Sequence, residues 1–138
     1  ADISKHVVIV GAGPAGLACA VTAAQRGHKV SLFDDHDCIG GQFNIARRIP
    51  GKEEFAETLR YYQVQLDELG VNIHLNQRLS SADLAALAAD ELVIATGIAP
   101  RQLDIPGIEH SKVLTYLDVM NGAEVGNKVA IIGAGGIG

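Results

Sequence analysis

Cysteine is scarce in this sequence of 138 residues: Cys19 and Cys38 are the only two, and they form no CxxC pair. A disulfide scaffold or a zinc site needs more thiols, so both are excluded, and a reducing compartment, the cytoplasm, fits the composition. Basic residues are also few, 11 against 16 acidic ones, which gives a formal net charge of -5. Because nucleic-acid-binding modules usually present a basic face, this balance argues against nucleic acid as a partner.

Long hydrophobic runs are scarce as well, and the one that is present is interrupted. The 18 residues from Val7 to Ala24 carry no charge, a length that would admit a membrane helix. Three glycines and a proline interrupt its first half, and a signal peptide would need a basic segment before the run and a small-residue cleavage site after it. A buried strand followed by a helix therefore explains the run better than a membrane span or a leader does.

Apolar spacing divides the first hundred residues into strands and helices. Apolar residues of 53–69 recur at spacings of four, three, four and three, the stripe of an amphipathic helix. Ser80 and Asp83 form a capping box for a shorter helix. We expect strands at 6–10, 29–33, 71–75 and 91–95, helices at 14–26, 53–69 and after 80, and a loop over 34–49. Strand–helix–strand units of this length join parallel strands, so the predicted fold class is α/β with a parallel sheet.

Residues 11–16, Gly-Ala-Gly-Pro-Ala-Gly, match the pattern GxGxxG between an expected strand and an expected helix. In that context the pattern is typical of a dinucleotide-binding turn. Gly11 permits the tight turn, Gly13 lets the backbone approach a pyrophosphate, and Gly16 lets the helix pack on the strand. The N–H groups and the positive dipole end of the helix would then face the phosphates.

An acid that could accept hydrogen bonds from a ribose follows the second expected strand. Asp34 lies 18 residues after Gly16, and Asp35 is the alternative. A carboxylate there would repel a 2′-phosphate, so we expect this site to hold FAD, NAD or ADP, and not NADP. The alternative is that no ligand binds, and that these residues are only a glycine-rich turn and an acid on the protein surface.

A second glycine turn follows an apolar stretch at 128–132, which we expect to be a strand. Gly133, Gly135 and Gly138 repeat the spacing of the first turn. Two such turns suggest two dinucleotides, as an enzyme that passes hydride from nicotinamide to flavin requires. A single site with a chance run of glycines is the alternative.

Six segments form a longer pattern across the chain. They are Gly11–Gly16, Phe33-Asp34, Ile39-Gly-Gly-Gln-Phe-Asn-Ile45, Ile49-Pro-Gly-Lys-Glu-Glu-Phe55, Ala95-Thr-Gly97 and Gly133–Gly138. Together they resemble the bacterial NADPH-dependent 2,4-dienoyl-CoA reductase family, over essentially all 138 residues. The two glycine turns alone would indicate only the wider class of flavoproteins with a glutathione-reductase-like, Rossmann-like FAD/NAD(P) fold.

The resemblance implies the architecture of a larger enzyme. Members of that family join an old-yellow-enzyme-like barrel, with FMN and a 4Fe–4S cluster, to an FAD domain and an NADPH domain. Electrons pass from NADPH to FAD, through the cluster to FMN, and on to a dienoyl-CoA of fatty-acid degradation. This chain lacks the barrel and the cysteines for the cluster, so by itself it is expected to be inactive and to hold no catalytic residue.

The resemblance also implies FAD contacts from several parts of the chain. The first glycine turn (Gly11, Gly13, Ala15 and Gly16) would hold the pyrophosphate, and Asp34 would bind the adenosine ribose. A loop at Gly41 and Gln42 would close on the cofactor. The Leu79 backbone would meet the adenine, and Thr96 with Gly97 would pass close to the dinucleotide. Arg47 and Lys52 would contact phosphate or ribose, or else be solvated surface charges.

Two neighbouring chemistries are not expected. Disulfide-reducing relatives such as glutathione reductase place a cysteine pair soon after Gly40-Gly41, where this chain has Gln-Phe-Asn, and we expect Cys19 and Cys38 to be buried or partly buried. The run 34–38 contains acids and a histidine, but adjacent residues of one loop seldom point at one ion. No metal site is therefore predicted.

We expect an excerpt of a longer polypeptide, with three parts. Residues 1–97 would be the N-terminal segment of an FAD-binding domain, 98–127 a linker with a short strand or helical turn at 113–120, and 128–138 the first strand and turn of an NADPH-binding domain. Such an excerpt would expose a sheet edge and apolar surface. The alternatives are another enoate or NADH reductase of the same plan, and an ADP-binding structural domain like that of trimethylamine dehydrogenase.

Overall fold

The computed structural model describes residues 3–101, 103–133 and 135. Its strands are β1 (His6–Val10), β2 (Lys29–Phe33), β3 (Asn72–His74) and β4 (Glu91–Ile94). Its helices are α1 (Pro14–Gln25), α2 (Phe43–Ala46), α3 (Phe55–Glu68), α4 (Ser81–Ala86) and α5 (Tyr116–Met120). The chain divides into two compact units: Ala1–Ile98 contains these four strands, and Ala99–Gly138 contains α5.

The four strands form one parallel sheet in the order β3-β2-β1-β4, which confirms the predicted fold class. Val8 of β1 lies opposite Ser31 of β2 and Leu92 of β4. The strand order reverses between β1 and β4, because β2 and β3 follow on one side of β1 and β4 lies on the other. In open parallel sheets, ligands bind at this reversal, outside the carboxyl ends of the strands.

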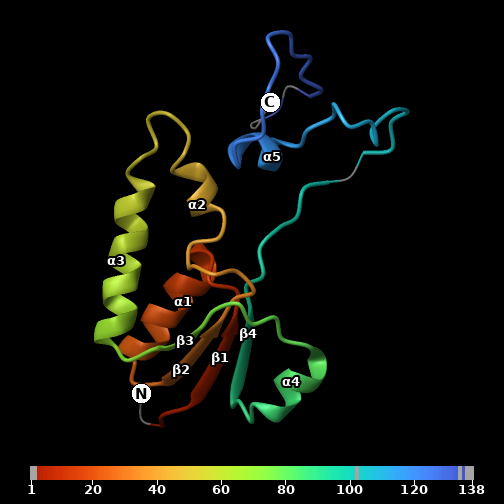
Figure 1. Ribbon diagram of the computed structural model, residues 1–138. Coiled ribbons are helices and arrows are strands. Elements are labelled where there is room, and N and C mark those ends of the chain that lie inside the picture. Colours follow the sequence, from red (N-terminus) through yellow and green to blue (C-terminus); the bar gives the residue numbers. More distant parts are fainter. Residues whose placement is uncertain (1–2, 102, 134, 136–138) are drawn as a thin grey trace. The chain divides into compact units, whose positions relative to one another are not determined.

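The direction of each connection determines which face a helix covers. The crossovers through α1 and α3 step away from β1, and the crossover through α4 steps back across the sheet. Because parallel crossovers are right-handed, α1 and α3 share one face and α4 lies on the other, as Figure 1 shows. The core cluster lies on the α1 and α3 face and includes Val7, Ile9, Val30 and Leu32 of the sheet with Leu17, Ala20, Leu59 and Leu66 of the helices.

The uncharged run near the N-terminus is a strand followed by a helix, as predicted. Val8 and Ile9 point to opposite faces of the sheet, and both are fully buried. Pro14 begins α1, where its missing N–H costs nothing. Gly27 follows the end of α1 with a φ of 84°, the left-handed conformation that commonly ends a helix. None of the described helices has both the length and the apolar composition needed to cross a membrane.

The amphipathic stripe and the capping box predicted for the later helices are also confirmed. In α3, Leu59 and Leu66 are buried against the core, whereas Val64 on the opposite side is 43% exposed. Ser80 and Asp83 cap α4 reciprocally, through hydrogen bonds of 2.8 Å and 3.3 Å to each other's backbone N–H groups. In the second unit a similar capping box precedes α5, so the segment 113–120 contains a helix.

Two local expectations are wrong. The segment 34–49 is not entirely loop, because it contains the single turn of α2. Residues 128–132 form no strand, and Val129, Ile131 and Ile132 are exposed. A parallel strand exists only where a neighbour completes its backbone hydrogen bonds, and no other described residue pairs with this segment. In the sheet itself, β4 is an edge strand that exposes Leu92 and Ile94.

The two faces of α3 provide a test of the core. We expect Leu66→Ala to lower the free energy of unfolding by about 2–5 kcal/mol, because it removes a fully buried side chain and leaves a cavity. Val64→Ala, on the exposed side of the same helix, is the control and should change stability by less than about 0.5 kcal/mol. Urea unfolding of the two variants measures the difference, and equal losses would contradict the packing described.

Candidate functional site

The first glycine turn lies where three segments of the chain meet. The Gly11 N–H donates to the Phe33 carbonyl at the end of β2 (2.7 Å), and the Ala95 N–H after β4 donates to the Val10 carbonyl (2.7 Å). The Gly40 N–H, from the loop before α2, donates to the Ala12 carbonyl (2.8 Å). The turn is thus held from three sides at the carboxyl end of β1.

Two of its glycines are required by the protein itself. Gly11 has a φ of 108°, and a Cβ there would lie 2.2 Å from the Ala95 carbonyl oxygen. A Cβ on Gly16 would lie 1.8 Å from the Gly11 carbonyl oxygen. Backbone therefore packs directly on backbone at both positions, and any side chain would separate α1 from β1 or β4.

Gly13 differs, because none of the residues that the structure describes requires a glycine there. Its φ is -74°, which any residue can adopt, and the nearest atom to an added Cβ is the Gly41 Cα at 4.0 Å, an ordinary contact distance. The space above Gly13 is bounded by Gly41, whose own Cβ would lie 3.0 Å from the Gly13 Cα. The absent side chain leaves room beside the backbone for something that is not protein.

This space lies at the N-terminus of α1. Gly13 is the N-cap of α1, and neither a side-chain cap nor an acidic residue in the first turn satisfies the end of the helix. The first N–H groups of a helix have no partners within it, and they carry the positive end of its dipole. Ala15, also in this first turn, is exposed. The geometry suits an anion held by backbone groups, which is how the resemblance would use Gly13 and Ala15.

Asp34 follows β2 and binds the glycine turn directly. Its Oδ2 accepts the Ala12 N–H at 2.6 Å, and its Oδ1 accepts the His36 N–H at 2.9 Å. Burial alone would raise the pKa of Asp34, but the hydrogen bonds from Ala12 and His36 outweigh it and hold the pKa below the ordinary value of 3.8. The side chain is therefore an ionised carboxylate at neutral pH, only 10% exposed.

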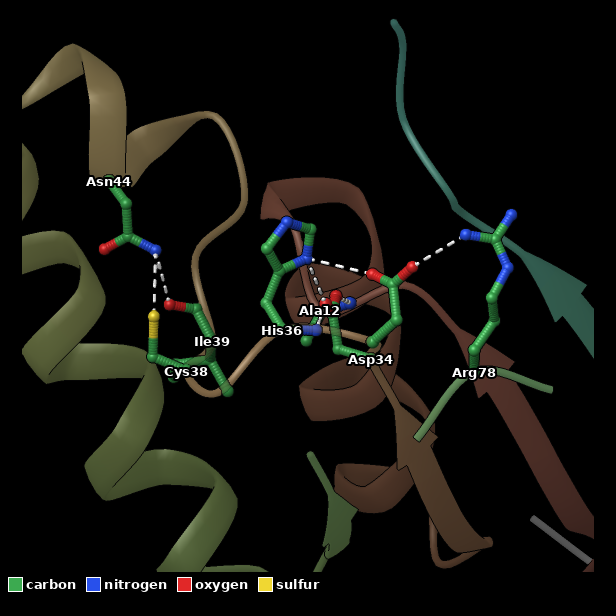
Figure 2. A network of polar contacts seen from close by, with 8 residues as sticks. Ala12, Asp34, His36, Cys38, Ile39, Asn44 and Arg78 are labelled. Carbon is green, nitrogen blue, oxygen red and sulfur yellow. Dashed lines mark hydrogen bonds and ion pairs between the residues drawn. The ribbon is translucent and has the colours of Figure 1, made fainter. Parts of the chain in front are cut away.

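The imidazole of His36 completes the surroundings of this carboxylate. Its Nδ1 lies 2.9 Å from the Asp34 Oδ1 and 3.0 Å from the Asp35 Oδ1, and Arg78 pairs with the other oxygen of Asp35 at 3.2 Å. Figure 2 shows His36 and Arg78 in one polar network with Asp34 and Ala12. We expected the side chains of this loop to diverge. One polar atom each of Asp34, Asp35 and His36 instead lies within 4.8 Å of the others, because Asp34 and His36 close a tight Asx-type turn.

The remaining residues predicted for the site lie at different distances from the turn. The amide nitrogen of Thr96 is 3.0 Å from where a Gly11 Cβ would lie, and Gly97 follows with a φ of 77°. Gln42 and Arg47 flank α2 as its N-cap and C-cap residues, and Arg47 and Lys52 are exposed. Leu79 is half-buried just before α4. The structure thus joins Asp34, Gly41 and Thr96 to the glycine turn through direct contacts.

The loop before α2 carries a free thiol that differs from the expectation. Cys38 is exposed, although Cys19 is partly buried as predicted. The Asn44 amide spans the loop, reaching the Ile39 carbonyl at 2.8 Å and the Cys38 Sγ at 3.7 Å (Figure 2). The apolar Ile39 points inward to the core instead, so its neighbour Cys38 faces out.

The second glycine turn repeats part of the geometry of the first. Gly133 has a φ of 105°, close to the 108° of Gly11. Gly135, the counterpart of Gly13, has no positive φ, and no atom of the described residues beyond its chain neighbours lies within 4 Å of an added Cβ. Gly138 lies outside the described residues.

Sequence reasoning missed three features of this site. The Ala12 N–H, the His36 ring and Arg78 all belong to the network of Asp34 and Asp35. The spacing Asp-x-His is a local signal that could have identified the His36 contact, because Asp side chains commonly bind the backbone two residues on. Arg78 is 43 residues from Asp35, and only the pairing of β2 with β3 brings these segments together.

The chain is similar to known reductases and dehydrogenases. The family model for pyridine nucleotide-disulphide oxidoreductase matches residues 5–138. N,N-dimethylglycine/sarcosine dehydrogenase of Chromohalobacter salexigens is 39% identical over 134 residues, which is 92% of this chain and 19% of that protein. Cinnamate reductase of Clostridium sporogenes is 40% identical over 140 residues, which is 100% of this chain and 21% of that protein.

A solved structure shows the same fold at comparable identity. The structure of a 2-naphthoyl-CoA reductase in complex with 2-naphthoyl-CoA matches with a TM-score of 0.85 and 41% identity, over 88% of this chain and 18% of that one. The chain therefore spans about a fifth of the length of the proteins that it matches.

The different reasons for Gly13 and Gly16 give a matched test of the turn. Gly16→Ala should lower the free energy of unfolding by at least about 2 kcal/mol, because the Cβ would overlap a carbonyl oxygen. Gly13→Ala should cost less than about 1 kcal/mol, since alanine is only a poorer N-cap there. Thermal or urea unfolding of both variants measures the difference. A Gly13→Ala variant as unstable as Gly16→Ala would show that Gly13 has no room for a side chain.

Proposed function

The chain belongs to the pyridine nucleotide-disulphide oxidoreductase family, and we propose that it is the FAD-binding part of a larger flavoprotein reductase. Gly13 is the observation that carries this proposal. Neither its φ nor any described neighbour requires it to be glycine, and it lies at the N-terminus of α1, which no side chain caps. A pyrophosphate against the backbone explains both features, because it needs the missing Cβ and the free N–H groups.

The residues present fit the rest of an adenine dinucleotide. Asp34 offers an ionised carboxylate after the carboxyl end of β2, at the same edge of the parallel sheet as the glycine turn. A ribose with free hydroxyls would be bound there. The backbone of Gly41 and Thr96 borders the turn on its other sides. In this role Gly13 and Ala15 hold the phosphates, Asp34 orients the ribose, and the loop at Gly41 limits access of water.

FAD, when bound here, would supply a flavin that can accept hydride from a reduced nicotinamide. The second turn is the proposed start of the nicotinamide site, since Gly133 has a positive φ like that of Gly11, and Gly135, like Gly13, has none. In this proposal residues 1–97 belong to the FAD domain, 98–127 are a linker, and 128–138 begin an NADPH domain. An FMN and a 4Fe–4S cluster would belong to the remaining four fifths of the protein.

The proposed substrate of the whole protein is a 2,4-dienoyl-CoA, reduced at the expense of NADPH. The pattern over residues 40–62 supports this, because it is the part of the chain that resembles the dienoyl-CoA reductase family most specifically. Two of the similar proteins point the same way by name: one reduces a CoA thioester, 2-naphthoyl-CoA, and the other cinnamate, an unsaturated acid.

A second candidate is an ADP-binding structural domain of an amine dehydrogenase. The similarity to N,N-dimethylglycine/sarcosine dehydrogenase, at 39% identity, favours it. The features at Gly13 and Asp34 concern only a pyrophosphate and a ribose, which ADP and FAD share. The second turn favours FAD, because a domain that only clamps ADP has no need of a nicotinamide site.

Nucleotide binding at Gly13 can be tested directly. In the full-length protein stripped of nucleotide, Gly13→Ala should weaken FAD binding roughly tenfold or more, because the Cβ would occupy the place of the pyrophosphate. Gly126→Ala is the control, since Gly126 also has open space and no positive φ but lies outside both turns. Flavin fluorescence titration measures both, and equal affinities in the two variants would refute the proposed site.

A further inference from the structure

The Asp34 carboxylate is surrounded by hydrogen-bond donors from the protein itself, which bears on how a ribose would reach it. This point rests on the proposed function. Oδ2 accepts the Ala12 N–H, and Oδ1 faces both the N–H and the Nδ1 of His36. An ionised carboxylate has about four acceptor positions, so three donors leave little capacity for a ribose diol.

The three donors differ in how easily they can leave. Ala12 is fully buried in the glycine turn, so its N–H cannot move away without breaking the turn. The His36 N–H belongs to the backbone of the turn after β2. The His36 imidazole, in contrast, is 74% exposed and is attached through rotatable bonds. It is the one donor that a ribose hydroxyl can replace without moving backbone.

We propose that His36 is a positioning residue for ribose recognition: its imidazole holds the Asp34 carboxylate against Ala12 and yields Oδ1 to a ribose hydroxyl when a nucleotide binds. The ring adds a second contact to Oδ1, beside the hydrogen bond from the His36 N–H, and so keeps the carboxylate aligned with the turn. Asp35 receives the displaced ring, because its Oδ1 already lies 3.0 Å from Nδ1.

The charges around the ring make this exchange sensitive to pH. Asp34, Asp35 and Asp37 face His36 from its own loop, and Arg78, from the segment after β3, faces it only across Asp35. The hydrogen bond to Asp34 raises the pKa of His36 above 6.5, burial opposes the shift, and the charges of the three acids add to it. A raised pKa means that the charged pair with Asp34 is fully present at low pH and is lost as the pH rises through the pKa of the folded state. A ribose therefore competes with an imidazolium in acid and with a neutral ring in base.

The test compares FAD binding at about pH 5.5 and about pH 8 in the full-length, nucleotide-free protein. We expect the Kd of the wild type to fall about three- to fivefold between these pH values, the range of a partly exposed ion pair. His36→Asn keeps a donor near the position of Nδ1 but does not titrate, so its Kd should not follow this pH change. His36→Ala should also lose the pH dependence. Because asparagine keeps a donor to Asp34 and alanine does not, the nucleotide-free His36→Asn protein should have a higher free energy of unfolding than His36→Ala.

Modified nucleotides separate the ribose from the phosphates. ADP and 2′,3′-dideoxy-ADP carry the same phosphates, so the ratio of their affinities cancels any general attraction of an imidazolium for the pyrophosphate. In the wild type, the affinity for ADP divided by that for 2′,3′-dideoxy-ADP should rise about three- to fivefold from pH 5.5 to pH 8. In His36→Asn this ratio should stay constant.

The outcomes are distinguishable. Equal pH profiles in the wild type and His36→Asn, or a ratio that does not change with pH, would overturn the role of His36 while FAD binding itself upheld the proposed function. A wild type that binds neither FAD nor ADP at either pH would overturn both. A structural role alone would lower the stability of the His36 variants without changing the pH profile of nucleotide affinity.

Discussion

The close approach of backbone to backbone at the carboxyl end of β1 is the constraint on which the rest of this structure depends. Gly11 and Gly16 allow α1 to begin immediately beyond the strand, with carbonyl oxygens where side chains would otherwise lie. Ala95 after β4 and Gly40 before α2 then bind the same turn. One short segment thereby fixes the position of a helix, an edge strand and a loop, and it directs the free N–H groups of α1 toward the point where the strand order reverses.

Around this turn, the polar groups hold one another in place through hydrogen bonds. Asp34 is bound to the backbone of the turn on one side and to the loop of His36 on the other. Its lowered pKa keeps it charged at neutral pH, and in the proposed function this charge would favour a ribose with free hydroxyls over one that carries a 2′-phosphate. The proposed function thus divides two tasks: glycine and backbone would hold phosphates without side chains, and a single carboxylate, held by its neighbours, would select the sugar.

Much of this could be predicted from the sequence, because it depends on local pattern. β1 and β2 have the predicted bounds, and the stripe of α3 and the cap of α4 follow from spacing and from one Ser–Asp pair. What could not be predicted depends on distant partners. Residues 128–132 have the composition of a strand, but none of the described residues pairs with them. Arg78 meets Asp35 only because the sheet brings their segments together. The sequence also predicted that Gly13 faces a ligand. Only the structure shows that a side chain at Gly11 or Gly16 would overlap backbone atoms, whereas one at Gly13 would not.

The central claim is that the first glycine turn carries FAD, and the most direct measurement is to identify what the protein binds. The full-length protein is purified, denatured, and its released nucleotides are separated by chromatography. The account predicts FAD in an amount equimolar with the chain. Release of ADP without FAD would contradict it, because the turn would then be a structural clamp and electron entry would lie elsewhere in the polypeptide. Release of no adenine nucleotide would remove the ligand on which the explanation of Gly13 depends.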